Sequence, residues 1–368
     1  MKKDDLCDAF GQIKDSYIIE ADTIRQQHTK VSYYLHQFKL AFMIPFTICV
    51  FIIIQGILVK PNLPILQYTT QDPGGFGIAT IYAKDITDIT QENPWSSSMK
   101  IKKLPVYQNY VTYGEHEPSK KRKQQMLEEV TYYQTLFSNL DIIENTDTYI
   151  TAENKQVEIR VDETLTTLID FKEAVALPEQ YAFYNHASKE ELYDAGTYLS
   201  QHYQNLLRMD HPVVVAKEGL QIQNQETFEL VNYELFVYEK ADTIEENMVN
   251  YGTYRAHFYC DEKHQLDFIR IEHMDKETYV EDYPIMDVKQ AKDLFLKQHP
   301  SIKEDDIIEV ELLYENSINQ PYVLPYYKFY VDQKKESLLM IDIPDEIYQM
   351  KTYSIPAIQQ EYMEEIGG

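Results

Sequence analysis

The sequence predicts an α+β protein with one N-terminal transmembrane helix, followed by an extracytoplasmic region of helices packed on antiparallel sheets. Three observations support this fold class. Residues 40–59 form an uncharged apolar run, helix-capping patterns precede amphipathic stretches, and several tyrosine-rich segments alternate apolar with polar residues. Alternation with a period of two is typical of a half-buried strand, and a period near 3.6 is typical of a helix. Helix-then-strand order recurs along the chain, which favours repeated helix-plus-sheet modules.

The membrane prediction depends on residues 40–59, LAFMIPFTICVFIIIQGILV, which are bracketed by Lys39 and Lys60. Twenty helical residues span the roughly 30 Å hydrocarbon core. A buried core helix is disfavoured because the run is both apolar on every face and flanked by lysines, and a cleaved signal peptide would lack its small-residue cleavage site after residue 60. Basic residues are concentrated between Lys3 and Lys39, so we expect a cytoplasmic N-terminus and an extracellular C-terminal domain at the cell membrane.

The N-terminal tail, residues 1–39, is predicted to form an amphipathic helix. Its apolar residues recur at coiled-coil spacing, which favours a protein partner: a membrane sensor kinase, a sigma factor or a second copy of the chain. A helix lying on the inner leaflet is the alternative, although six acidic groups among residues 1–39 make a poor lipid binder. The candidate partner-binding residues are Leu6, Phe10, Ile13, Tyr17 and Ile24.

The extracytoplasmic part divides into a linker at 60–77, a first α+β module at 78–186 and a second α+β region at 187–368. We predict helices at 119–140, from Ser188 and from Asp287, where Ser188-x-x-Glu191 and Asp287-x-x-Gln290 are capping patterns. Predicted strands cover 78–83, 104–110, 148–151, 156–161, 166–171, 228–238, 252–260, 266–273, 307–314, 322–331 and 338–343.

Composition argues against nucleic acid as a partner and against an intrachain disulfide. The net charge of −26 argues against nucleic acid, because binding phosphate requires a basic surface. Cys7, Cys49 and Cys260 lie before, inside and after the apolar run, so no intrachain disulfide is expected. Cys260 stands between His257 and His264, a spacing that resembles part of a metal site, but alternation along a strand favours packing and surface roles.

Motifs for catalysis are missing from the sequence. It contains no His-Glu-x-x-His, no Gly-x-Ser-x-Gly and no Walker loop, so we expect no catalytic residues, no cofactor and no metal. The basic run Lys120, Lys121, Arg122 and Lys123 opens the helix predicted at 119–140. It is either an exposed helix start or a contact for an anionic envelope polymer or lipid headgroup.

The C-terminal stretch resembles a known family. A helix at 287–299, then IEVELLY (308–314), a polar turn and LPYYKFYV (324–331) are similar to the terminal module of YycH/YycI-type and PepSY-like membrane-anchored regulatory proteins of Gram-positive bacteria. The resemblance implies an outer helix-plus-sheet domain that adjusts signalling by touching a sensor kinase. Separately, LCDAFGQIKD (6–15) resembles the inner tails of clostridial membrane proteins near anti-sigma systems.

The function that these observations favour is a non-enzymatic, membrane-anchored regulatory or sensory protein of the cell envelope, acting through protein–protein contacts. Two alternatives remain open. One is an extracytoplasmic hydrolase with a site built from dispersed acids and tyrosines, and the other is a scaffold that binds an envelope polymer. A deep cleft with converging carboxylates would favour the enzyme, and an open sheet edge would favour binding.

Overall fold

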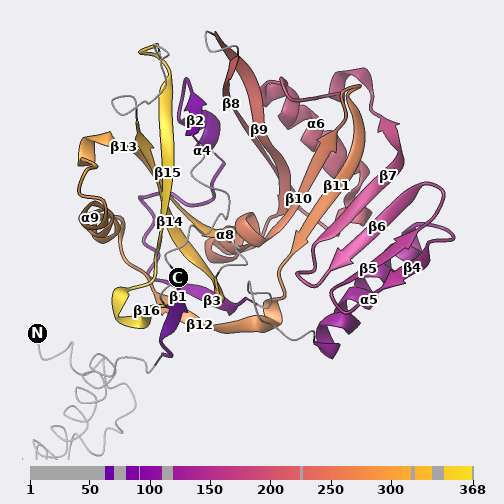
Figure 1. Cartoon of the computed structure of the whole chain (residues 1–368), viewed down its shortest axis with the longest axis horizontal. Helices are drawn as coiled ribbons and strands as arrows, with labels where there is room; N and C mark the ends of the chain where they lie inside the picture. Colours follow the sequence, from indigo (N-terminus) through magenta and orange to yellow (C-terminus); the bar gives the residue numbers. More distant parts are fainter. Residues whose placement is uncertain are drawn as a thin grey trace, which may run out of the picture. The chain divides into compact units, whose positions relative to one another are not determined.

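A computed structural model of the chain (Figure 1) describes residues 63–69, 80–90, 92–109, 119–223, 227–315, 320–333 and 344–366. All of these belong to one unit, Leu63–Gly368. The apolar run at 40–59, the N-terminal tail and the strand expected at 338–343 lie outside the described residues. Within the described ranges, no helix is both long and apolar enough to cross a membrane.

The predicted fold class is wrong, because the described residues form a predominantly antiparallel sheet protein. They contain sixteen strands and six α-helices, and fourteen of those strands belong to a single sheet. The prediction assumed that each helix-then-strand stretch builds its own small sheet beneath its own helix. Backbone pairing instead runs from one stretch into the next, so the helices are additions to one sheet rather than the centres of separate modules.

The middle of the chain builds one half of the sheet. Strands β11, β7, β6, β5 and β4 follow one another by antiparallel pairing, and β4 ends the sheet. The strands of this half are β4 (Asp141–Asn145), β5 (Tyr149–Glu153), β6 (Val157–Asp162), β7 (Thr167–Ala176), β8 (Pro212–Gln223), β9 (Thr227–Glu239), β10 (Tyr254–Cys260) and β11 (Gln265–His273).

Two helices cover one face of this half, α5 (Lys120–Leu136) and α6 (Lys189–His202). The Ser119 hydroxyl caps α5, and the predicted capping box of α6 is confirmed, with Ser188 and Glu191 satisfying each other's backbone amides. Between the helices and the sheet lies what we call the aliphatic core, which includes Val130, Ile150, Ile159, Val161, Ile169, Leu192, Leu199, Val237 and Ile269.

The other half of the sheet joins the two ends of the described chain. Strand β2 (Thr80–Ala83) pairs with β15 (Tyr348–Pro356). Strand β3 (Lys103–Gln108) pairs with β12 (Tyr279–Pro284) on one side and with β14 (Tyr322–Asp332) on the other. The strand β13 (Ile307–Glu315) pairs with β14. A separate parallel pair joins β1 (Leu66–Tyr68) to β16 (Met363–Glu365).

The second half encloses what we call the tyrosine-rich core. Helix α9 (Val288–Gln298), whose predicted capping box at Asp287 and Gln290 is confirmed, packs against it. The half-buried pattern predicted for 322–331 is wrong: on β14, side chains of both faces are buried, because other elements cover both sides of this central strand. The core includes Leu104, Tyr283, Phe295, Leu312, Tyr314, Tyr326, Tyr327 and Phe329.

The two halves meet in a narrow seam between β2 and β8. These strands share a single residue pair, Tyr82 with Leu220. The Tyr233 hydroxyl bridges the seam, because it accepts from the Tyr82 amide at 3.1 Å and lies 3.2 Å from the Tyr82 carbonyl and 2.9 Å from the Leu220 carbonyl. Its ring crosses Gly219, where an added Cβ would lie 2.0 Å from Tyr233 Cε2.

Helix α8 (Ile244–Thr253) forms the second connection between the halves. Met248 and Val249 join the tyrosine-rich core, while Tyr251 packs on Phe236 of β9. A strand was predicted from residue 252, but α8 ends at Thr253 and only then does β10 begin. The helix escaped prediction because its apolar residues face two different cores.

Candidate functional site

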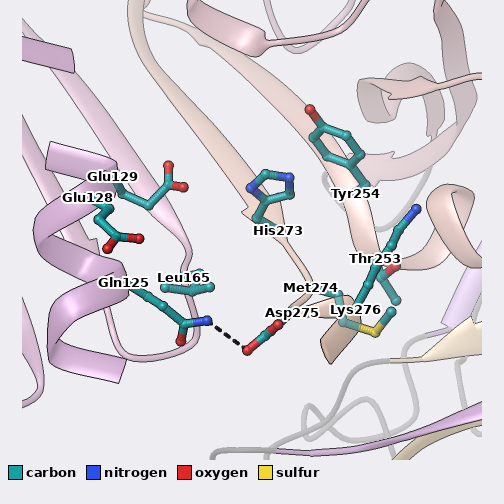
Figure 2. Close-up of a pocket in the computed structure, with 10 residues that line it drawn as sticks. All are labelled: Gln125, Glu128, Glu129, Leu165, Thr253, Tyr254, His273, Met274, Asp275 and Lys276. Atoms are coloured by element: carbon teal, nitrogen blue, oxygen red, sulfur yellow. Dashed lines mark hydrogen bonds between the residues drawn. The ribbon is translucent and has the colours of Figure 1, made fainter. Parts of the chain in front are cut away.

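A pocket of about 410 Å³ opens between α5 and the adjoining ends of β10 and β11 (Figure 2). It lies where α5, which rests on the aliphatic core, approaches the segment that leaves β11 for the other half. Its walls combine carboxylates, an imidazole, an ammonium group and two hydroxyls. The lining residues are Gln125, Glu128, Glu129, Leu165, Thr253, Tyr254, His273, Met274, Asp275 and Lys276.

The α5 wall carries three polar side chains at the spacing of one helix face. Gln125, Glu128 and Glu129 stand at i, i+3 and i+4, so they project from neighbouring turns of one side. Glu129 forms an ion pair with Arg208, 2.9 Å between Oε1 and Nη1, and the Arg208 guanidinium lies 3.6 Å from the centre of the Tyr132 ring. The Glu129 carboxylate is therefore held in place by a cation that is itself positioned by an aromatic face.

The opposite wall begins where β11 ends. Asp275 caps the short 3₁₀-helix η2 (Lys276–Thr278) through the Glu277 amide, and it accepts from Gln125 Nε2 at 3.0 Å. Arg122 Nη2 lies 3.6 Å from the same carboxylate. Burial alone would raise the pKa of Asp275, but these donors and the nearby cations lower it below its usual value, so the group is ionised at neutral pH.

His273 and Tyr254 form the inner part of the pocket, with ring centroids 4.3 Å apart. Burial lowers the pKa of His273, and Arg208 adds to this effect while Glu129 opposes it, so the imidazole is neutral at pH 7. Burial raises the pKa of Tyr254 to about 12. The Tyr254 hydroxyl donates to the Arg208 carbonyl at 2.9 Å, and the Thr253 hydroxyl donates to the Val249 carbonyl at 2.6 Å.

The basic run predicted as an anionic-surface contact opens the helix that forms this pocket. Lys120 is exposed, but Lys121 pairs with Glu277 at 2.6 Å and Lys123 with Asp147 at 2.8 Å. Arg122 is only 3% exposed and faces Asp275, so it serves the pocket wall rather than the surface. Contact of the remaining lysines with an anionic polymer stays a prediction. The other candidate residues, Leu6, Phe10, Ile13, Tyr17 and Ile24, lie outside the described residues.

The metal-like spacing around Cys260 does not produce a cluster. His257 lies beside Phe236 on the face away from the helices, Cys260 packs against the aliphatic core, and His264 stacks on Tyr184. In the part of the chain that the structure describes, no three potential ligands come together as a metal site. Burial raises the pKa of the Cys260 thiol to about 12, so the thiol is protonated at neutral pH.

An ionic cluster occupies the face of β8–β11 that α5 and α6 leave uncovered. Lys217 Nζ lies 3.2 Å from Glu234, Arg255 Nη2 lies 2.6 Å from Glu272, and both His257 nitrogens are 3.9 Å from one of these carboxylates. Burial alone would raise the pKa of Glu234, but Lys217 and Arg255 lower it to about 2. Each of Lys217, Glu234, Arg255 and Glu272 has an oppositely charged neighbour, which is the arrangement of a structural network.

The sequence analysis predicted neither the α5–β11 pocket nor the ionic cluster, although the sequence contained a signal for the pocket. Gln125, Glu128 and Glu129 share one helix face, which the spacing along the predicted helix could have shown. Nothing local connected that face to residues 273–276, because the two segments are brought together by tertiary packing. No protein-family model matches the chain, and no curated protein matches it either. The geometry of the pocket is therefore the basis for assigning a function.

Proposed function

We propose that the chain is a non-enzymatic regulatory or sensory protein of the cell envelope, and that its α5–β11 pocket binds a small zwitterionic ligand. The observation that supports this is the placement of charge around a cavity of about 410 Å³, with carboxylates on the α5 wall and Lys276 on the other (Figure 2). Cavities of roughly 300–1,000 Å³ are typical of small-molecule sites.

The ligand class follows from which charged groups are already engaged. Glu129 is paired with Arg208, and Asp275 faces Arg122. Among the described residues, Glu128 accepts a hydrogen bond only from the neutral amide of Gln124, at 3.0 Å, and Lys276 has no ion-pair partner. An ammonium group would neutralise Glu128 and a carboxylate would neutralise Lys276, which is the chemistry of an amino acid or a short peptide.

Binding is better supported than nucleophilic hydrolysis. A nucleophile needs a hydrogen bond to a base, but the hydroxyls of Thr253 and Tyr254 both donate to backbone carbonyls. Tyr254 is also far from ionisation at neutral pH, since burial raises its pKa to about 12. A neutral His273 beside these groups supplies a polar wall for a ligand without activating either hydroxyl.

The regulatory part of the proposal concerns the N-terminal tail. We propose that the protein resides at the cell membrane, because residues 40–59 are uncharged and apolar, and that the described domain lies outside the cell. The apolar stripe that includes Phe10, Tyr17 and Ile24 would meet a sensor kinase, a sigma factor or a second copy of the chain. Protease added to intact spheroplasts should digest the described domain; protection would contradict this orientation.

Calorimetric titration of the full-length purified chain with glycine and with alanyl-alanine tests the pocket. We expect saturable binding by at least one of these probes, and a weakening of at least ten-fold in both Glu128→Gln and Lys276→Gln. Glu190→Gln on α6 and Lys289→Gln on α9 are matched controls, because both residues are exposed and distant from the pocket lining. Equal binding by all four variants would contradict the site, and release of free alanine from the dipeptide would favour the hydrolase alternative.

A further inference from the structure

The strand β4 is one end of the large sheet. Among the described residues it pairs with β5 alone, on one side, and it stands last in the strand order (Figure 1). All five of its residues are exposed. A terminal strand presents a row of unpaired backbone amides and carbonyls, and these groups accept only another extended backbone as a continuous partner.

The side chains of β4 add apolar surface to this edge. Ile142 is 40% exposed and Ile143 is 55% exposed. A register shift between Ile142 and Glu144 makes Ile143 the extra residue of a β-bulge, and its side chain lines a groove of about 710 Å³. The groove is also lined by Ser138, Asn139, Asp141, Glu153, Asn154, Lys155 and Gln156.

The opposite end of the sheet shows how an edge is normally protected. The terminal strand there, β12, ends in Pro284, which has no amide hydrogen to donate, and its exposed residues are Tyr279, Glu281 and Asp282. Lysine and proline are the usual residues that block pairing at an edge. β4 contains neither, and its centre is a pair of isoleucines.

Charge decides between a second copy of this chain and a different partner. Antiparallel pairing of β4 with another β4 would bring Asp141 and Glu144 of both copies onto one short ribbon, between molecules that each carry a net charge of −26. Like charges across a strand pair are destabilising. Basic side chains from a different chain would instead meet two carboxylates, while apolar ones would cover Ile142 and Ile143.

We infer that β4 is the docking edge for an extended segment of another protein in which lysine or arginine alternates with apolar residues. The segment adds to the sheet as a strand beyond β4, with its backbone paired to β4 and an apolar side chain placed in the groove beside Ile143. This site is separate from the α5–β11 pocket, so each can be tested without the other.

The test uses immobilised heptapeptides in which valine alternates with lysine, probed with the full-length chain. A matching array carries glutamate in place of each lysine. We expect saturable binding to the lysine peptides only, a loss of at least ten-fold when salt is raised from 50 to about 500 mM, and slower hydrogen exchange at residues 141–145 in the complex.

Two variants assign the binding to this edge. Ile143→Lys should weaken binding at least ten-fold, because a lysine in the groove repels the basic strand and blocks the edge. Tyr279→Lys, at an exposed position on β12, should leave it unchanged. Circular dichroism confirms that both variants are folded. Absence of saturable binding, equal binding by Ile143→Lys, or protection elsewhere than 141–145 would overturn the inference.

Discussion

The two halves of the sheet build their buried cores from different residues. The aliphatic core lies between one face of the sheet and the helices α5 and α6, and isoleucine, leucine and valine dominate it. The tyrosine-rich core has two shorter helices packed against it, α9 and part of α8, and its largest fully buried side chains are mostly tyrosine and phenylalanine. One half is covered by two long helices, and the other relies more on large rings that fill it from within.

The buried hydroxyls explain how tyrosine can replace a covering helix. A helix satisfies its own backbone, whereas loops that close over a core leave carbonyls without partners. Tyr283 donates to the Pro64 carbonyl at 2.9 Å, Tyr314 to that of Pro105 at 2.7 Å, and Tyr327 to that of Met286 at 2.7 Å. Each ring therefore fills volume and ties an irregular segment or the strand β3 to the core.

The largest effect should come from truncating the ring at the centre of the tyrosine-rich core. Phe329 is fully buried and stacks on Phe295 with centroids 4.3 Å apart. Phe329→Ala should lower the free energy of unfolding by about 3–5 kcal/mol, whereas Ile159→Val in the aliphatic core should cost about 0.5–1.5 kcal/mol. Urea denaturation of the purified chain measures both. A loss below about 1 kcal/mol for Phe329→Ala would show that the tyrosine-rich core repacks around the missing ring.

A change at the seam between β2 and β8 tests whether this connection depends on the tight fit of Tyr233 against Gly219. Gly219→Ala places a methyl group against the Tyr233 ring and should cost about 1–3 kcal/mol. The same change in a Tyr233→Ala background should cost much less, because the obstructing ring is gone. Thermal unfolding of the wild type, the two single variants and the double variant gives the coupling free energy between Gly219 and Tyr233. Additive costs would mean that the ring and the glycine do not depend on each other.

Two neighbouring tyrosines allow the stability contributed by a hydroxyl to be measured apart from that of its ring. Tyr327→Phe removes a hydrogen bond to Met286 and should cost about 0.5–1.5 kcal/mol. Within the described part of the chain the buried Tyr326 hydroxyl has no hydrogen-bond partner, so Tyr326→Phe should be neutral or stabilising. Equal losses in urea denaturation would show that the hydroxyl bonds do not set the difference between the two cores.

The smallest expected effect is the loss of folding stability at acidic pH that comes from the ionic cluster. The pKa of Glu234 is lowered from 4.5 to about 2 in the folded protein, so its ionised form favours folding. This contribution is present above pH 4.5 and is lost as the pH falls towards 2. Because the Glu234 side chain is 28% exposed, the effect is modest. Glu234→Gln should flatten the acid limb of a plot of melting temperature against pH; an unchanged limb would assign acid sensitivity to other carboxylates.

Sequence reasoning was most successful where the signal is local. The caps at Ser188 and Asp287 and the strands predicted at 228–238 and 266–273 depend on neighbouring residues, and the structure confirms those elements. Strand partners are not set locally. A period of two identifies a strand but not the strand it pairs with, so the single sheet was taken for separate modules.

The candidate site could be predicted only in part, for the same reason. The α5 face with Glu128 and Glu129 is visible in the helical spacing, but its opposite wall comes from residues 273–276. Arg122 looked like part of a basic surface run, yet it is buried against Asp275. Composition and spacing cannot show which member of a charged run turns inward.

The pairing of β2 and β3 with strands near the other end of the chain has a consequence for synthesis. Thr80 pairs with Lys351 and Gln108 with Tyr322, so each of these strands leaves the ribosome more than 200 residues before one of its two partners. At about 5–20 residues per second, that interval is roughly 10–50 s. During this time the middle of the chain holds every strand from β4 to β11 and can assemble its sheet first. The early strands wait for β14 and β15, and the tyrosine-rich half closes only after the last long strand has been made.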